Sequence, residues 1–193
     1  AVTRTGEVWC WGDNNKSQLG NGFTVAEESL MPVKTLVLVD AVSVTVGNEF
    51  TCARVRSGAV YCWGHNNHGQ LGSNAVLQEY DTPQLVPALG NVALVRSGGG
   101  HSIALRPDGT LRCWGTNGAR QCAAAAPVDI DPPAVVDAAG LAFHDVDAGA
   151  EHNCARAAID GAIYCWGRNV EGQVGNGTFD PAGTPSRVAL ECR

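Results

Sequence analysis

Residues 58–72 read GAVYCWGHNNHGQLG, and this stretch decides the fold because similar stretches recur along the chain. Its centre, Cys-Trp-Gly, occurs four times with successive offsets of 52, 51 and 52 residues, at Cys10-Trp11-Gly12, Cys62-Trp63-Gly64, Cys113-Trp114-Gly115 and Cys165-Trp166-Gly167. A nearly constant period of this length is typical of proteins built from repeated structural units. The chain is therefore predicted to be a tandem array.

Each copy contains the signals of several short strands. A glycine turn leads into alternating residues before every Cys-Trp-Gly, as in Gly58-Ala59-Val60-Tyr61. A second shared block lies upstream, and β-branched runs such as Val42–Val46 and Val92–Val95 precede it. A fourth strand is predicted near Pro83–Val86 and, in the last copy, near Pro185–Val188. No segment keeps a 3.6-residue apolar period, so we predict an all-β fold without a long helix.

Four short strands in about 50 residues are typical of a β-propeller blade. One blade cannot bury both of its faces, so its neighbours must cover them. The four repeated tryptophans are predicted to lie in equivalent buried places between blades, at Trp11, Trp63, Trp114 and Trp166. The alternative is that these rings stack on a ligand. A residue present in every unit more often serves the unit itself.

The combined pattern resembles a known repeat. A Gly-x-x-His block followed by Gly-x-Val-x-x-Trp-Gly-x-Asn-x-x-Gly-Gln-Leu-Gly is similar to the repeat of the regulator of chromosome condensation family, in a bacterial, cysteine-paired form. The pattern covers nearly the whole chain, and only the third copy departs strongly, at Arg120, Cys122 and Ala123. The resemblance implies a ring of seven blades. We therefore expect an open arc of about four blades, a fragment of that ring, with units at residues 1–40 (partial), 41–91, 92–142 and 143–193.

Eight cysteines are present, and their spacing favours disulfide bonds. A three-residue loop Arg56-Ser57-Gly58 would place Cys52 opposite Cys62, close enough to be bridged. A four-residue loop would place Cys154 opposite Cys165 in the same way. In the third copy Ile103 stands where a facing cysteine is expected, which leaves Cys122 as a possible partner for Cys113.

The alternative is that these cysteines are small buried hydrophobic residues. Two independent facing pairs favour disulfides, and disulfides indicate an extracellular, periplasmic or cell-surface location. The facing partner of Cys10 would come one residue before Ala1, and no role is assigned to Cys192.

The spacing of Cys62, His65 and His68 resembles a set of zinc ligands. Other copies carry Asp13 and Lys16, or Arg168 and Glu171, at the two histidine places, so the repeat does not require a metal. His101 and His152 align with Phe50, which indicates a structural place in the blade. None of the common catalytic motifs is present. We therefore predict no metal, no cofactor and no enzymatic activity.

Charge and hydropathy restrict the partners. The 13 basic and 19 acidic residues give a formal net charge of −6, and the basic residues are scattered singly. Nucleic-acid binding is therefore not expected. No apolar run approaches the ~20 residues that span a bilayer, so membrane insertion is not expected either.

Three functions fit these features. The first is a non-catalytic, secreted or surface-associated module that binds another protein; the resemblance supports it, because secreted bacterial relatives include a propeller that inhibits β-lactamases. The second is a guanine-nucleotide exchange factor-like regulator of a small GTPase, as among eukaryotic relatives that also dock on chromatin. The third is a structural array on a bacterial surface. Contacts with a partner are predicted at loop residues that vary between copies: Glu49, Phe50, His65, His68, Glu151 and Arg168.

Overall fold

The computed structural model describes residues 1–23, 28–74, 77–123 and 128–189. These residues form fourteen strands and no helix. All strand pairs are antiparallel and join neighbours in the sequence, giving one two-stranded sheet and three four-stranded sheets. The strands, in chain order, are β1 (Trp9–Gly12) and β2 (Ser29–Lys34); β3 (Ala41–Val46), β4 (Phe50–Val55), β5 (Val60–His65) and β6 (Glu79–Leu85); β7 (Leu94–Ser97), β8 (His101–Leu105), β9 (Leu111–Gly115) and β10 (Ile130–Val135); β11 (Phe143–Ala148), β12 (His152–Ala157), β13 (Ile163–Gly167) and β14 (Ala182–Arg187).

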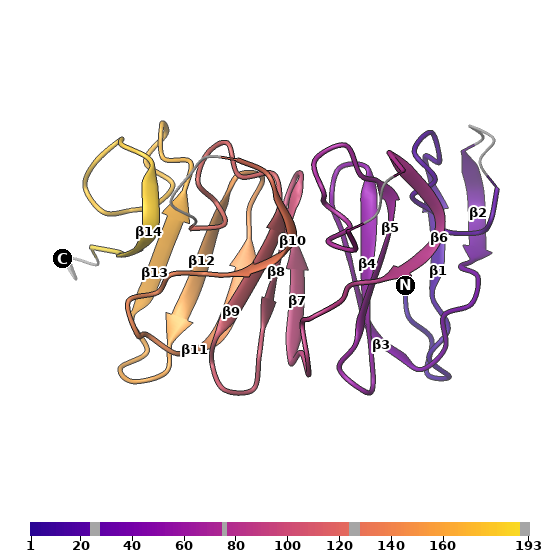
Figure 1. The fold of residues 1–193 in the computed structure, drawn as a ribbon, viewed down its shortest axis with the longest axis horizontal. Coiled ribbons are helices and arrows are strands. Elements are labelled where there is room, and N and C mark those ends of the chain that lie inside the picture. The colour runs from indigo at the N-terminus through magenta and orange to yellow at the C-terminus, as the bar shows by residue number, and fades with distance from the viewer. Residues whose placement is uncertain (24–27, 75–76, 124–127, 190–193) are drawn as a thin grey trace.

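The sheets stand side by side in chain order, with the first and the last at opposite ends of the row (Figure 1). Consecutive four-stranded sheets meet through their first two strands, since β7 contacts β3 and β4, and β11 contacts β7 and β8. Small antiparallel sheets that pack face to face in sequence are blades of a β-propeller. The predictions of an all-β fold and of propeller blades are confirmed. We refer to the sheets as blades one to four.

The observed strands begin close to the predicted ones. β3 covers the predicted run Val42–Val46, whereas β7 lies two residues after the start of Val92–Val95. The fourth strands, β6 and β14, begin earlier than the prolines predicted to start them. Proline has no N–H to donate, and these prolines occupy the last strand of each blade, where one side of the backbone has no strand beside it.

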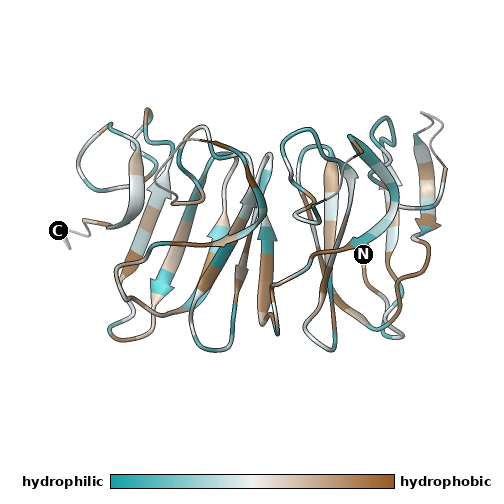
Figure 2. Ribbon diagram, viewed as in Figure 1, coloured by the Kyte–Doolittle hydropathy of each residue, from teal (hydrophilic) through white to brown (hydrophobic). Residues whose placement is uncertain are grey.

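Three hydrophobic cores lie between consecutive blades. Each contains the tryptophan of the later blade: Trp63, Trp114 and Trp166 are all completely buried. Apolar residues also occupy the segments that link one blade to the next (Figure 2), and Leu38 and Leu89 in these links are nearly inaccessible. The blades are thus held together by cores shared between neighbours, as a repeat array requires.

Trp11 is an exception, and the prediction that all four tryptophans are equivalently buried is wrong there. Its side chain is 54% exposed, whereas the other three are 0% exposed. The buried tryptophans are covered by the loop of the preceding blade. Among the described residues no blade stands before the first one, so the ring of Trp11 lacks the covering loop that the other three tryptophans have.

The Asn-x-x-Gly-Gln-Leu-Gly motif forms this covering loop. In the second blade the Asn66 Oδ1 atom accepts a hydrogen bond from the Leu71 N–H at 3.1 Å, and the Gln70 carbonyl accepts one from the Trp114 indole N–H at 3.0 Å. Trp63 and Trp166 donate in the same way to the Gln18 and Gln121 carbonyls. The repeated tryptophan therefore contributes both a buried ring and a hydrogen bond to the preceding blade.

Candidate functional site: a polar basin at one end of the blades

A cavity of about 580 Å³ lies at the end of the blades where the first strand turns into the second and where the third strand ends. Blades two, three and four all contribute to its wall. We call this cavity the polar basin. Its principal polar side chains are Asn48, Glu49, His65, His68, Gln70, Thr116, Gln121, Asp129 and Glu151.

Backbone hydrogen bonds hold the turns of the three blades in a row. The Asn48 N–H donates to the Gly99 carbonyl, and the Gly99 N–H donates to the Ala150 carbonyl, both at 3.0 Å. Gly64 has a φ of 100°, and a Cβ atom there would lie 2.6 Å from the Glu49 carbonyl oxygen. Only glycine permits this close approach. The repeated Trp-Gly therefore places the turn carrying Glu49 beside the strand end carrying His65.

The loop after β5 positions the two histidines of the basin. The Gln70 Oε1 atom accepts a hydrogen bond from the His68 N–H at 2.9 Å, and Gln70 Nε2 lies 3.4 Å from His65 Nδ1. His65 Nδ1 also lies 3.0 Å from Glu49 Oε2. His68 Nδ1 lies 2.7 Å from Asp129 Oδ2, so this pair joins the second blade to the third.

A second cluster of charges continues the basin into the fourth blade. Arg168 contacts Glu151 at 2.9 Å and Glu171 at 3.0 Å. These hydrogen bonds, first to Glu171 and then to Glu151, raise the pKa of Arg168, and the hydrogen bond from Arg168 lowers the pKa of Glu171. All three side chains are solvent-exposed, so their pairing orders the surface more than it stabilises the fold.

The basin and its margin carry four carboxylates, Glu49, Asp129, Glu151 and Glu171, against one permanent cation, Arg168. The two histidines add positive charge only when they are protonated. The surface is therefore acidic at neutral pH, with exposed carboxylates that accept hydrogen bonds. Such a surface complements a basic protein surface.

The structure brings together most of the residues predicted to contact a partner. Glu49, His65, His68 and Glu151 line the basin. Arg168 adjoins it through Glu151. The prediction for Phe50 is wrong, because its side chain is 1% exposed and belongs to the core between blades two and three. Asp129 was not predicted from the sequence, because the third copy is irregular there and nothing in the sequence links Asp129 to His68, 61 residues earlier.

Six of the seven described cysteines lie as pairs across strands or loops. Cys52 faces Cys62, and Cys154 faces Cys165, each with Cα atoms 4.1 Å apart, and both pairs are joined by disulfides. Cys113 is joined to Cys122. Three such pairs are compatible with an oxidising location. Cys192 lies outside the described residues. Cys10 is a free thiol, and burial raises its pKa.

The zinc arrangement considered for Cys62, His65 and His68 does not form, because the Cys62 sulfur is bonded to Cys52. Among the described residues, no group of three or more His, Cys, Asp or Glu side chains could hold a metal ion. In the same part of the chain, no helix is long and apolar enough to cross a membrane.

Blades of this form, joined by Trp-to-carbonyl hydrogen bonds, define a repeat protein of the β-propeller class. The chain belongs to the regulator of chromosome condensation (RCC1) repeat family. One model of this repeat matches residues 5–54, 57–105 and 160–191, and a second matches residues 41–70, 92–121 and 143–173. The family predicted from the sequence is confirmed.

Relatives and solved structures agree with this assignment. The chain is 35% identical over 183 residues to the human probable E3 ubiquitin-protein ligase HERC6, and 30% identical over 192 residues to mouse HERC4. These matches cover 91% and 97% of this chain but only 18% of each relative. Human WBSCR16 has the same fold, with a TM-score of 0.87 at 22% identity, as does yeast RCC1 (Prp20), with 0.83 at 21%. The chain spans half of each of these two structures, and 98% of it is covered by each.

Proposed function

We propose that this chain is a non-catalytic module that binds another protein through the polar basin, and that it works outside the cell, in the periplasm or on the cell surface. The observation that carries the proposal is the convergence of Glu49, His65, His68 and Glu151 on one cavity formed by three blades. These residues come from loops that vary between repeats, while the tryptophans and glycines beneath them repeat. A rigid scaffold with variable loops is suited to recognition.

The charge of the basin indicates the character of the partner. Four carboxylates stand against one arginine, so the complementary surface is basic. The described residues of the basin and its margin do not form the stripe of cations that would favour nucleic acid. One solved protein of this fold, yeast RCC1 (Prp20), is described in a structure with Kap60 bound to it and by its binding properties to Gsp1p and histones. The three disulfides support an oxidising location.

The test is affinity capture with immobilised chain from the extracellular or periplasmic fraction of the source cells. A variant that carries Glu49→Arg and Glu151→Arg reverses two charges of the basin. We expect it to lose at least tenfold of the captured partner, because like charges then oppose one another across the interface. Raising the salt concentration should weaken capture by the original chain in the same direction.

Asp108→Arg is the matched control, since Asp108 is an exposed carboxylate on the β8–β9 hairpin at the other end of the blades. It should leave capture unchanged. Equal capture by the basin variant and the control, with all chains folded by circular dichroism, would show that the basin is not the binding surface.

A further inference from the structure

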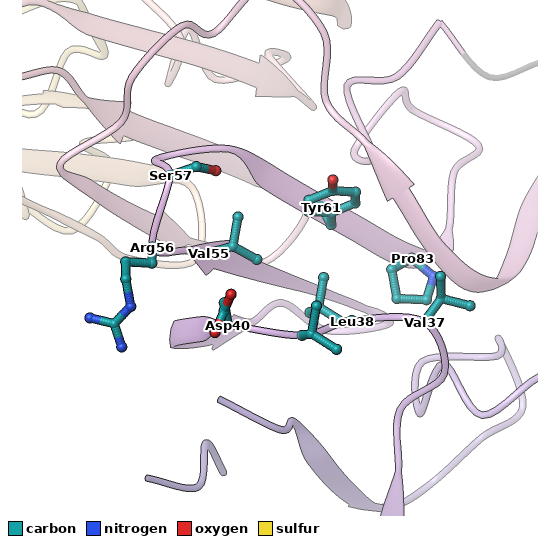
Figure 3. A pocket seen from close by; sticks show the side chains of 9 residues that line it. Val37, Leu38, Asp40, Val55, Arg56, Ser57, Tyr61 and Pro83 are labelled. Carbon is teal, nitrogen blue, oxygen red and sulfur yellow. The ribbon is translucent and has the colours of Figure 1, made fainter. Parts of the chain in front are cut away.

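A second cavity, of about 280 Å³, lies at the opposite end of the blades from the polar basin. It is formed by residues 37–40, which link β2 to β3, together with the β4–β5 hairpin and Pro83 of β6 (Figure 3). Because β3 and β4 are antiparallel, the start of β3 and the end of β4 share one end of the blade, and the basin occupies the other. We call this cavity the link pocket.

Val37 in the link pocket has a conformation that its side chain disfavours. Its φ is 63°, in the left-handed region, which β-branched residues rarely adopt and which costs about 1 kcal/mol or more. The side chain is 88% exposed, so packing within the chain does not offset this cost. At the corresponding places in the next two links stand Ala88, with φ 61°, and Ala139, with φ 50°. The positive φ is therefore common to all three links, and what distinguishes this link is that an exposed, β-branched residue occupies the place held by alanine in the others.

The link pocket has an apolar part and a charged end. Leu38 and Val55 are 4% and 8% exposed, and Tyr61 and Pro83 complete the apolar wall. Figure 3 shows Val37 and Pro83 at one end of the group and Arg56 with Asp40 at the other. The side chains of Arg56 and Asp40 have no hydrogen-bond or ion-pair partner among the described residues. The pocket thus offers one free guanidinium and one free carboxylate next to apolar surface.

The size of the pocket restricts its occupant. A volume of about 280 Å³ is below the ~300–1,000 Å³ of pockets that enclose drug-sized ligands, and suits a single amino-acid residue. A carboxyl-terminal residue combines three matching groups in one unit. Its carboxylate can accept two parallel hydrogen bonds from a guanidinium, its amide N–H can donate to a carboxylate, and its side chain can be apolar.

We propose that the link pocket binds the carboxyl-terminal residue of a partner polypeptide that ends in a branched apolar side chain. The terminal carboxylate pairs with Arg56, the amide N–H of the same residue donates to Asp40, and the side chain packs between Leu38, Val55 and Tyr61. Val37 and Val39, both exposed, cover the outer side of the bound residue. This proposal is independent of the polar basin, which lies at the other end of the blades.

The experiment uses N-acetyl-L-leucine, which contains the three required groups, titrated into the chain labelled with ¹³C at its valine and leucine methyl groups. Saturable shifts are expected at the methyl signals of Val37, Val39 and Val55. N-acetyl-L-leucinamide lacks the carboxylate and should bind roughly tenfold more weakly, because a charge-assisted bidentate contact is lost. Equal affinity for the two compounds, or shifts confined to other methyl groups, would overturn the proposal.

Variants locate the interaction. Arg56→Gln should lower the affinity for N-acetyl-L-leucine to that for the amide, while Arg106→Gln, on the corresponding hairpin of the next blade, should leave it unchanged. Val37→Ala copies the residue found in the other links. It should weaken binding several-fold while raising the midpoint of thermal unfolding, since the strained valine is removed. Unchanged affinity in Arg56→Gln or in Val37→Ala contradicts the proposal.

Discussion

His101 occupies the place held by Phe50 in the preceding blade and by His152 in the following one. It is 0% exposed, and its Nε2 atom lies 3.0 Å from Asn153 Oδ1 in the fourth blade. Its Nδ1 atom is buried without a partner. Burial, more than any other influence, lowers the pKa of His101 from 6.5 to about 4. The folded chain therefore contains a neutral imidazole in the interface between blades three and four.

From the lowered pKa of His101 we expect the folded chain to lose stability in acid. The pKa of His101 is lower in the folded state than in the unfolded state, so the unfolded state binds the proton more readily. The contribution of the neutral His101 to the free energy of unfolding is therefore full above pH 6.5 and is lost as the pH falls towards 4. A shift of this size corresponds to about 3 kcal/mol over that range. His101→Phe, which copies Phe50, should remove this part of the pH dependence in urea unfolding measured at several pH values.

The comparison that matters is the pH dependence and not the stability at one pH, since Phe cannot hydrogen-bond to Asn153. His144→Gln, at an exposed histidine on β11, is the control and should keep the original pH dependence. If His101→Phe loses stability between pH 6.5 and 4 as steeply as the original chain, protonation of His101 is not the cause.

Single residues also show where sequence analysis reaches its limit. Phe50 begins a strand directly after a turn, so its position suggested a loop, but its ring packs beneath Gly47, and only the folded turn shows this. Asp129 pairs with His68 across a blade boundary, and no spacing in the sequence indicates that contact. Local patterns predict which residues lie in the turns, whereas contacts between loops of different blades depend on how the blades pack.

At the scale of strands and hairpins, the repeat is highly predictable. The three-residue loop between β4 and β5 determines the register, and the structure has Cys52 opposite Cys62. The extra residue in the β12–β13 loop is absorbed without changing the register of Cys154 and Cys165. Trp63, Trp114 and Trp166 are buried as the period predicts, whereas Trp11 is not, because burial depends on the blade before it.

Because disulfides join the strands of two hairpins, we expect the stability of the chain to depend on the redox conditions. In the chain-entropy description, each short loop closed by a disulfide stabilises the fold by about 2 to 3 kcal/mol. Thermal unfolding with and without a reductant should therefore show a lower midpoint in the reduced chain. Peptide mapping under non-reducing conditions, after oxidising expression, should recover the peptides that join Cys52 to Cys62 and Cys154 to Cys165. Free thiols at all four positions would contradict the disulfides and remove the support for an oxidising location.

At the scale of the whole molecule, the two end blades expose complementary groups. At each boundary between described blades, the indole N–H of the later blade donates a hydrogen bond to a glutamine carbonyl of the preceding blade. Trp63 donates to Gln18 in this way, and Trp166 donates to Gln121. The indole of Trp11 has no such acceptor among the described residues, and its ring is 54% exposed. The Gln173 carbonyl, at the corresponding place in the fourth blade, receives no indole there. Each end therefore shows one half of an interface that the chain forms three times internally.

We expect the isolated 193-residue chain to associate head to tail, with the Trp11 face of one copy against the fourth blade of another. Exposed apolar blade faces favour association because burying them removes apolar surface from water. A contact of this heterologous kind does not close with two copies, so the average mass in sedimentation velocity should rise continuously with concentration. Trp11→Arg should shift the chain towards monomer, since it removes the ring and introduces a charge at the centre of the contact. Val135→Arg is the control, because Val135 is 57% exposed but lies on β10, the edge strand of the third blade, which is not an end blade. A compact monomer at all concentrations would show that the end blades are stable without neighbours. Equal weakening by both variants would show that the Trp11 face is not the contact surface.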